Sequence, residues 1–433
     1  MNEVPVPKRF ETIEATGLDD TFLVDLATKI LSIRGTVCPS TLASEMRLSK
    51  VIANEIIAIL IDQLLVESQG LEGNGLKSEI RYSLTDAGFK RGLEAMTKCA
   101  YVGPAPVPIA DLIRQIRQQS IHREVITPER LEAALSHLVL DKEILTQFGP
   151  AVNSARSILL YGEPGNGKTS IAEALSGCFD DIIYIPFSVI VGGQIIRFFD
   201  ETVHSPVDVT PEQLPGFDRR WVACRRPVVL AGGELRLEDL DLKFDPVSRY
   251  YEAPMHTKAL GGVFVLDDFG RQKVASQDFL NRWIVPLEKN VDFFSLHTGM
   301  KFALPHDQLV IFSTNHEPEE VGDSASLRRI FFKIHVPSPT KEEYLQIFRS
   351  ACVEADVDFD EEVISEFYDR RYIAEGLVTS GAHPRFLIAH IKAASTFLGV
   401  EPRLEPERLD LAWRNVSATR LRGSGPAAVT RTS

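Results

Sequence analysis

The sequence has no long apolar run, few cysteines and no excess of positive charge, and each deficit excludes a class of protein. No uninterrupted apolar stretch is long enough to span a bilayer, and residues 1–11 lack the apolar core of a signal peptide. The five cysteines form no C-x-x-C pair, so we expect reduced thiols in a cytoplasmic protein. The net charge of −13 disfavours bulk attraction to nucleic acid.

Composition and patterning instead indicate a globular chain of several domains. Its 433 residues are 44% hydrophobic and 25% charged, which suits two or three folded domains. Composition shifts along the chain predict six segments, which we list in order. They are an N-terminal extension (1–19), a helical domain with a hairpin (20–98), a Pro-rich linker (99–110), an α/β core (111–337), a helical segment (338–420) and a disordered tail (421–433).

The core segment alternates helices with short continuous apolar runs, which is typical of parallel strands covered by helices on both faces. We expect five such strands, which are SILLY, DIIYIP, VFVL, LVIFS and FFKIHV. Two β-rich stretches interrupt this core. One lies within residues 204–260, where Gly232-Gly233 and Asp245-Pro246 predict hairpin turns, and the other turns near Thr298-Gly299.

The spacing G-x-x-x-x-G-K-T follows the first of these strands. Its eight residues are Gly162, Glu163, Pro164, Gly165, Asn166, Gly167, Lys168 and Thr169, and Ser170 continues into a helix. Glycines let backbone N–H groups converge on one anion, and the helix adds the positive end of its dipole. Tight strand-to-helix packing is the alternative reason for such glycines, but the full context favours a phosphate-binding loop. Lys168 would reach the β- and γ-phosphates of ATP, and Thr169 would ligate Mg²⁺.

A second pair of groups stands at the end of the strand VFVL. Asp267 and Asp268 are two acids at one buried strand end, where they would repel one another without a cation or a chemical role. Asp267 fits a ligand of Mg²⁺ through water, and Asp268 fits the group that orients and polarises the attacking water. A simple aspartate cap at a turn is the alternative, and the phosphate loop makes it the weaker one.

With these motifs in place, residues 111–415 resemble an AAA+ ATPase. GEPGNGKT resembles the Walker A motif, VFVLDD the Walker B motif, and LVIFSTN ends at Asn315, the sensor 1 position that aligns the lytic water. GAHPRFL resembles sensor 2 through Arg385. The hairpin before LVIFS is similar to that of MoxR-like ATPases. Asp268 departs from the pattern, because the family usually has glutamate there and the shorter side chain alters the reach to water.

The resemblance also implies an assembly. SASLRRIFFKI resembles the segment that carries the arginine finger, with Arg329 as first choice and Arg328 as second. A finger supplied to a neighbouring subunit implies a homo-hexamer or a similar ring, and activity that requires assembly. The ring size, the protein client and the role of residues 204–260 stay open.

The segment 20–98 is expected to run helix, helix, helix, hairpin, helix, which resembles a winged helix-turn-helix domain. Such domains often bind DNA, but residues 1–100 carry eleven Lys or Arg against fourteen Asp or Glu. This balance favours protein docking. We therefore expect a ring ATPase that remodels protein assemblies, with the front domain as adaptor. An ATP-controlled DNA-binding regulator and a nucleotide-dependent scaffold with little turnover remain alternatives.

Overall fold

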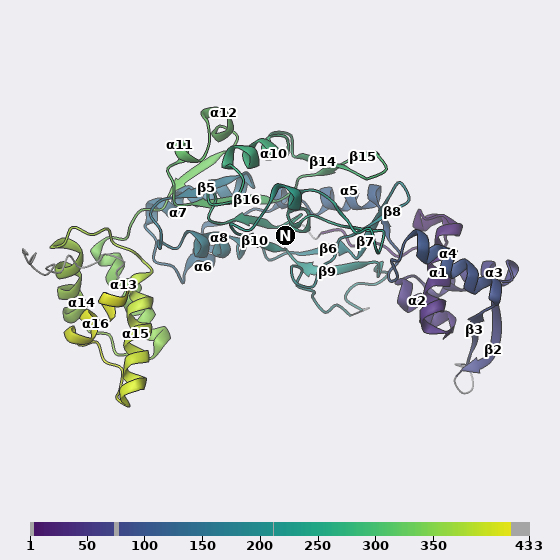
Figure 1. Cartoon of the computed structure of the whole chain (residues 1–433), viewed down its shortest axis with the longest axis horizontal. Helices are drawn as coiled ribbons and strands as arrows, with labels where there is room; N and C mark the ends of the chain where they lie inside the picture. Colours follow the sequence, from purple (N-terminus) through teal and green to yellow (C-terminus); the bar gives the residue numbers. More distant parts are fainter. Residues whose placement is uncertain (1–3, 73–77, 211, 417–433) are drawn as a thin grey trace, which may run out of the picture.

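The computed structural model describes residues 4–72, 78–210 and 212–416, and its centre is a parallel five-stranded sheet (Figure 1). All neighbouring strands of this sheet run parallel. Their order across the sheet is β10 (Val228–Ala231), β13 (Val263–Leu266), β16 (Leu309–Thr314), β5 (Ile158–Tyr161) and β17 (Phe332–His335). The predicted α/β class with a five-stranded parallel sheet is therefore confirmed.

All five predicted runs form strands, but one of them lies outside the central sheet. The run DIIYIP forms β6 (Ile182–Pro186), which pairs antiparallel with β9 (Trp221–Arg225) outside the central sheet. Its place is taken by β10, from the stretch in which we expected only hairpins. In β10, exposed and buried residues alternate, which suits the edge of a sheet, whereas β6 is buried along most of its length. Both are short apolar runs, so sequence pattern alone does not separate them.

Alternate residues of the central strands face two separate cores. Ile158 and Leu160 of β5 pack with α6 (Pro128–Leu135), α7 (Lys142–Ser154) and α8 (Lys168–Ser176). Leu159, between them, packs on the other face with α10 (Ser276–Lys289). Continuous apolar strands arise because both faces are covered by helices.

A β-rich region lies beside the central sheet. It contains a five-stranded sheet in the order β11 (Lys243–Phe244), β12 (Tyr251–Glu252), β8 (Gln194–Arg197), β7 (Ser188–Val191) and β4 (Val107–Pro108). The turn predicted at Asp245-Pro246 is confirmed, because β11 and β12 pair antiparallel around it. The hairpin predicted near Thr298-Gly299 is confirmed as β14 (Val291–Ser295) and β15 (Lys301–Pro305). Gly232-Gly233 forms no hairpin and leads from β10 to a short 3-10 helix (Leu237–Leu240).

The front domain has its elements in the predicted order. These are α1 (Asp20–Arg34), β1 (Thr36–Val37), α2 (Pro39–Met46), α3 (Lys50–Asp62), β2 (Val66–Glu72), β3 (Glu79–Leu84) and α4 (Asp86–Lys98). Ser49 and Thr85 cap α3 and α4 through their side chains. Helix α2 has Cys38 at its N-cap and Pro39 in its first turn. The hairpin turn, which includes Lys77, lies outside the described residues.

Residues 99–108 of the expected Pro-rich linker pack against the protein, and residues 109–110 already belong to the helix that follows. Ala105 and Val107 are fully buried, and the Ala105 N–H donates to the carbonyl of Met46 (2.8 Å). Val107 and Pro108 pair with β7, and α5 (Ile109–Gln118) follows at once. The apolar residues between the prolines supply enough buried surface to hold the segment against the protein.

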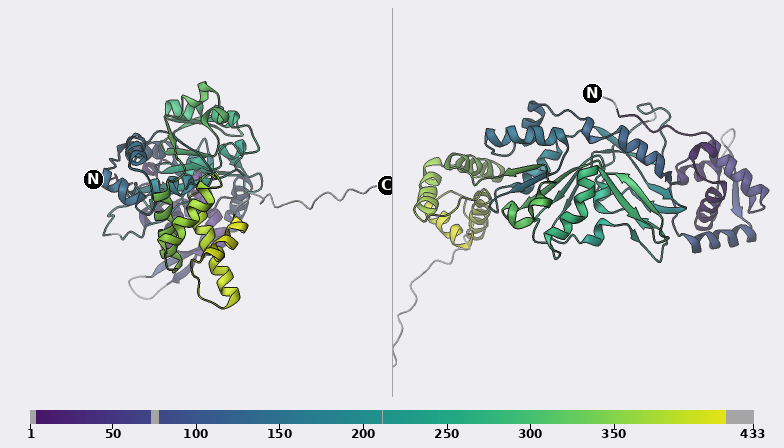
Figure 2. Two further views of the ribbon diagram at one scale, coloured as in Figure 1. Left: turned by 90° about the vertical axis from the view of Figure 1, so that its left-hand side faces the viewer. Right: turned by 90° about the horizontal axis from the view of Figure 1, so that it is seen from above.

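The C-terminal part forms a compact helical domain with its own core. Its helices are α13 (Lys341–Ala355), α14 (Glu361–Tyr368) with a π-helical turn (Asp369–Ile373), α15 (His383–Leu398) and α16 (Pro406–Val416). The front domain and this domain lie at opposite ends of an elongated molecule (Figure 2). The predicted disordered tail (421–433) lies outside the described residues. In the part of the chain that is described, we find no helix with the length and apolarity that a membrane span requires.

Candidate functional site

The phosphate loop joins β5 to α8 in the predicted way. Gly162, Gly165 and Gly167 have φ angles of 138°, 82° and 77°, which a residue with a Cβ rarely adopts. A Cβ placed on Gly167 would meet no atom within 4 Å, so the loop faces open space at that point. Helix α8 begins at Lys168, directly after this glycine, and directs its N-terminus into the same space.

Lys168 is held inside the loop. The residue is 6% exposed, and its Nζ donates to the carbonyls of Gly162 and Glu163 at 2.9 Å each. Burial lowers the pKa of Lys168, and the nearby carboxylates of Asp267, Asp268 and Glu163 oppose that shift. An anion placed in the loop would further favour the charged amine.

The acids of the predicted site lie where neighbouring strands end. Thr169 Oγ1 donates to Asp267 Oδ2 (2.8 Å), so the two expected Mg²⁺ ligands are in direct contact. Asn315 Nδ2 donates to Asp268 Oδ1 (3.3 Å), which joins the end of β16 to the end of β13. Asp268 has a φ angle of 49°, in the left-handed region that aspartate tolerates better than most residues.

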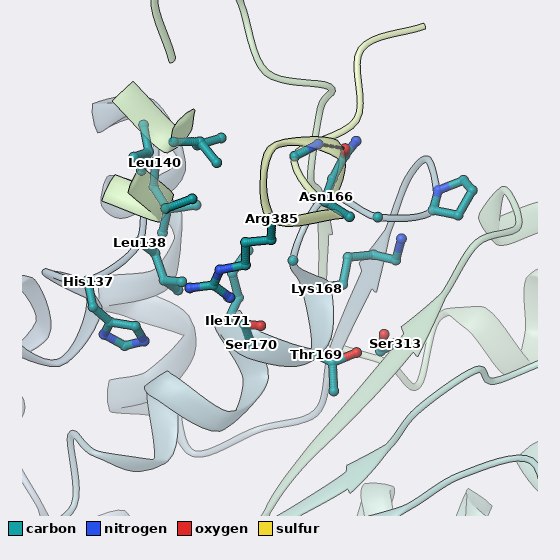
Figure 3. Close-up of a pocket in the computed structure, with 18 of the residues that line it drawn as sticks. His137, Leu138, Leu140, Asn166, Lys168, Thr169, Ser170, Ile171, Ser313 and Arg385 are labelled. Atoms are coloured by element: carbon teal, nitrogen blue, oxygen red, sulfur yellow. Dashed lines mark hydrogen bonds between the residues drawn. The ribbon is translucent and has the colours of Figure 1, made fainter. Parts of the chain in front are cut away.

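These groups line one end of a cavity of about 580 Å³ (Figure 3). Loop residues Pro164 to Ser170, both aspartates and Asn315 form its polar end. Apolar side chains form a wall elsewhere, and they are Leu138, Val139, Leu140, Ile347, Ala351 and Phe386. A cavity with an anion-binding end and an apolar wall suits a nucleoside triphosphate.

Arg385 also lines this cavity, from the first turn of α15, with Pro384 beside it as expected. Its guanidinium donates to Glu354 Oε1 (3.0 Å) and points towards Leu138, away from the amine of Lys168 (Figure 3). The side chains of Arg385 and Glu354 are 61% and 57% exposed, so solvent screens their attraction. An anionic ligand would compete with Glu354 for this arginine.

Arg328 and Arg329, the two candidates for the arginine finger, lie far from this cavity. They precede β17, whose Phe332 pairs with Ile158, whereas the phosphate loop follows the opposite end of β5. Arg329 is occupied, because its Nε donates to Glu288 (2.7 Å) and its Nη1 to the carbonyl of Ala325. Arg328 is exposed, and its side chain makes no hydrogen bond or ion pair with the residues that the structure describes.

The polar end of the cavity fits Mg²⁺ in its chemistry. The hydroxyl of Thr169 and the carboxylate of Asp267 are hard oxygen ligands, which Mg²⁺ prefers. They already share one hydrogen bond at the mouth of the phosphate loop, where a cation would also contact phosphate oxygens.

Four residues that contribute to the site were not found from the sequence. Gln272 accepts from the Gly270 N–H (2.8 Å) through Oε1 and shapes the turn that follows Asp268. Glu354 binds Arg385, and Ser338 and Gly381 contact Asn166 of the phosphate loop. Gly381 opens the GAHPRFL segment, but its contact with Asn166 was not expected, and Gln272, Glu354 and Ser338 belong to no motif spacing. All four reach the site only through tertiary packing.

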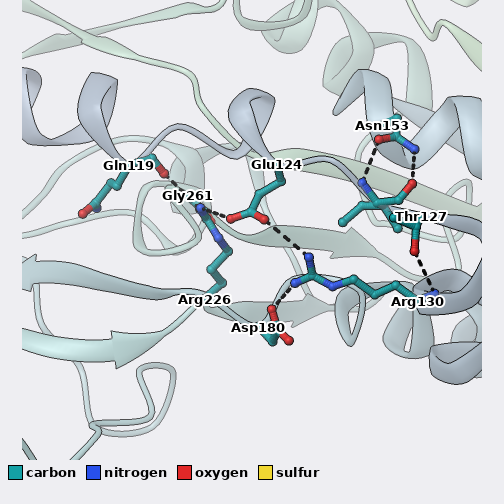
Figure 4. Close-up of polar contacts among 9 residues, drawn as sticks. Gln119, Glu124, Thr127, Arg130, Asn153, Asp180, Arg226 and Gly261 are labelled. Atoms are coloured by element: carbon teal, nitrogen blue, oxygen red, sulfur yellow. Dashed lines mark hydrogen bonds and ion pairs between the residues drawn. The ribbon is translucent and has the colours of Figure 1, made fainter. Parts of the chain in front are cut away.

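A second polar cluster lies at the opposite ends of the strands (Figure 4). Arg226, just before β10, donates to Glu124 (2.8 Å) and to the carbonyls of Gln119 (3.0 Å) and Gly261 (2.6 Å). Arg130 joins the same cluster through Asp180 and Glu124. Burial and the neighbouring carboxyl of Asp181 raise the pKa of Glu124. This cluster ties β10 and β13 to the connecting loops, so its role is in the fold.

Comparison with known proteins gives one family match. Residues 340–415, which span α13 to α16, match a family described as a domain of unknown function (DUF8689). No curated protein matches the chain.

Among solved structures, the chain is similar to RuvB of Thermotoga maritima. Two RuvB variants match with a TM-score of 0.36, at 12% and 14% identity, over 68% and 67% of this chain and 72% and 70% of theirs. RuvB described as a Holliday junction branch migration motor matches with a TM-score of 0.34 and 13% identity, over 69% of this chain and 72% of that one. At these TM-scores and identities, the similarity is no evidence of activity. Any inference about activity rests on the contacts within this chain.

Proposed function

We propose that this protein is an AAA+ ATPase that binds ATP with Mg²⁺ and hydrolyses it to ADP and phosphate. One observation carries the proposal. Lys168, Thr169, Asp267, Asp268 and Asn315 come from three separate strand ends and surround one end of a single cavity, with direct contacts between them. The order of the motifs along the chain agrees with the resemblance described above.

Different residues would bind the phosphates, hold Mg²⁺ and activate the attacking water. The loop amides and Lys168 would hold the β- and γ-phosphates. Thr169 and Asp267 would hold Mg²⁺, which neutralises negative charge on the phosphate oxygens when it is bound. Asp268 would orient the attacking water and take its proton, and Asn315 fixes one oxygen of that carboxylate.

Neither arginine before β17 can reach the phosphate loop of its own chain, because they stand at the other end of the sheet. We propose that one of them completes the site of a neighbouring subunit in a ring. Arg328 suits this role better than our first choice, Arg329, which would have to leave Glu288 before it could act.

For the front domain we propose a winged-helix fold that docks a protein. Three of its cations are engaged in ion pairs within the protein, with Arg34 bound to Glu45, Lys50 to Glu79 and Arg91 to Asp25. The hydrogen bond from Lys50 lowers the pKa of Glu79 to about 2, which reflects how closely the two groups interact. A DNA-binding surface needs free cations for phosphates, so the pairing favours a protein remodeller over the DNA-binding regulator.

ATP turnover by purified protein tests the proposal directly. Lys168→Ala should abolish binding of a fluorescent ATP analogue while the fold survives, and Asp268→Asn should bind the analogue but turn over little. Arg328→Ala should bind normally and hydrolyse poorly. Mixing Arg328→Ala with Asp268→Asn should restore part of the activity, because some interfaces then contain one intact copy of each residue.

Each alternative predicts a different outcome. Turnover that is negligible in the parent would favour the scaffold. Turnover stimulated by DNA at moderate salt would favour the regulator. Full activity of dilute monomers, without rescue on mixing, would contradict the ring.

A further inference from the structure

The residue between the last two glycines of the phosphate loop contacts the helical domain. Asn166 Nδ2 donates to Ser338 Oγ (3.2 Å), and the Gly381 N–H donates to Asn166 Oδ1 (3.3 Å). The orientation of the amide is fixed by its partners, because a backbone N–H can only donate and therefore requires the oxygen. Asn166 thus uses both ends of its side chain to connect two points that are far apart in the sequence.

Those two points are where the helical domain joins the site. Ser338 lies between β17 and α13, flanked by Pro337 and Pro339, which stiffen this connection. Gly381 lies just before α15, the helix that carries Arg385. The bridge through Asn166 therefore ties the entry to the domain and its helix at the cavity to the same loop residue.

The backbones on the two sides also approach closely. A Cβ at Gly165 would collide with Ser380 Oγ and come within 3.3 Å of the Ala382 Cβ. A Cβ at Gly381 would lie 3.4 Å from the carbonyl oxygen of Gly165. Glycine at these positions lets the helical domain press against the loop, so the contact involves several residues around Asn166.

We propose that Asn166, through Ser338 and Gly381, is a positioning residue by which the helical domain shapes the phosphate loop for its ligand. Glycine-rich segments lose much conformational freedom when they are ordered, and a loop held beforehand has less to lose on binding. Coupling between two sites is reciprocal, so a phosphate in the loop strengthens the contact in return. This inference rests on the proposed function, because it concerns the binding of nucleotide at that site.

A double-mutant cycle in the full-length protein tests the proposal. Affinity for a fluorescent ATP analogue should fall about tenfold in Asn166→Ala, which loses two hydrogen bonds, and about threefold in Ser338→Ala, which loses one. In the Asn166→Ala background, Ser338→Ala should have no further effect, because the bond is already absent. Equal threefold losses in both backgrounds would show that Ser338 acts independently and would overturn the bridge.

Hydrogen exchange gives a readout without nucleotide. Amides of residues 378–383 should exchange faster in Asn166→Ala than in the parent, and nucleotide should slow them in the parent only. Unchanged affinity and unchanged exchange in Asn166→Ala would overturn the inference while leaving the proposed ATPase intact. If the parent itself bound no analogue, the proposed function would fail first.

Discussion

The two terminal domains are attached to the central sheet in different ways. The front domain shares a hydrophobic core with the β-rich region, since Ile195 of β8 belongs to the same buried cluster as α1 and α3. Buried cations reinforce the junction, where Lys29 donates to the carbonyls of Cys99 (3.0 Å) and Tyr101 (2.6 Å). The helical domain has a core formed from its own residues, and Asn166 connects it to the phosphate loop.

This difference assigns the two domains different mechanical roles. A junction with a shared apolar core moves as one body with the centre, because separating it would expose buried apolar surface. A junction of polar contacts at a ligand site can be strengthened or weakened by what binds there. The nucleotide should therefore act first on the helical domain, and the front domain should keep its position relative to the centre.

The largest expected effect comes from breaking the front junction at Arg220. This residue is 1% exposed, and it binds Asp218 (2.8 Å) and the carbonyls of Thr16 and Pro106 (3.3 Å each). Arg220→Ala leaves Asp218 buried without its partner and should lower the free energy of unfolding by about 3–5 kcal/mol. Denaturant unfolding measures this loss.

Arg219→Ala is the matched control, because Arg219 is the exposed neighbour in the sequence. It should change the free energy of unfolding by less than about 0.5 kcal/mol. Equal losses in both variants would show that the junction does not depend on the buried pair.

A second prediction uses acid to test the stability of the central part of the molecule, apart from the two terminal domains. Burial, and next the charge of His256, lower the pKa of His306 to about 3, so the folded protein keeps His306 neutral. An unfolded chain protonates this histidine near pH 6.5 and then binds more protons than the folded chain. Stability should therefore fall as the pH drops below 6.5, by about 2 kcal/mol at pH 5 from this group alone.

His306→Gln removes that titration. Its free energy of unfolding, measured by denaturant at pH 7 and pH 5, should depend less on pH than that of the parent. The same pH dependence in both proteins would mean that other groups carry the acid sensitivity, such as His204, whose pKa is also lowered by burial.

The smallest expected effect lies at the helical domain. Glu354→Gln removes the anion that competes for Arg385, and it should raise affinity for a fluorescent ATP analogue about two- to threefold, since exposed ion pairs are weak. Glu361→Gln, which removes an exposed acid bound to Arg349 instead, is the control and should leave affinity unchanged. A loss of affinity in Glu354→Gln would indicate that Glu354 itself contacts the ligand.

The phosphate loop could be predicted residue by residue because its chemistry is local. Gly162, Gly165 and Gly167 adopt the backbone angles that their type permits, and Lys168 begins the helix that their spacing implies. The meeting of Thr169 with Asp267 followed from a general property of parallel sheets, whose strand ends lie at one edge.

The strands β6 and β10 show a limit of the sequence pattern, which does not predict which of the two joins the central sheet. Both segments are short and apolar, and their placement depends on which partner strands and buried charges surround them. Arg226 fixes the start of β10 beside Gly261, a contact between residues 35 positions apart.

The sequence by itself determined the α/β class, the conformation of the glycine-rich loop, the paired acids and the acidic balance of the front domain. These follow from local backbone preference, strand periodicity and composition, which act over a few residues or over the whole chain. Only the tertiary structure decided that the Pro-rich segment is packed, that Arg329 is bound to Glu288 while Arg328 is exposed, and that Asn166 joins the loop to the helical domain. These contacts form where surfaces that are far apart in the sequence pack together and exclude water. No local spacing of residues predicts which surfaces will do so.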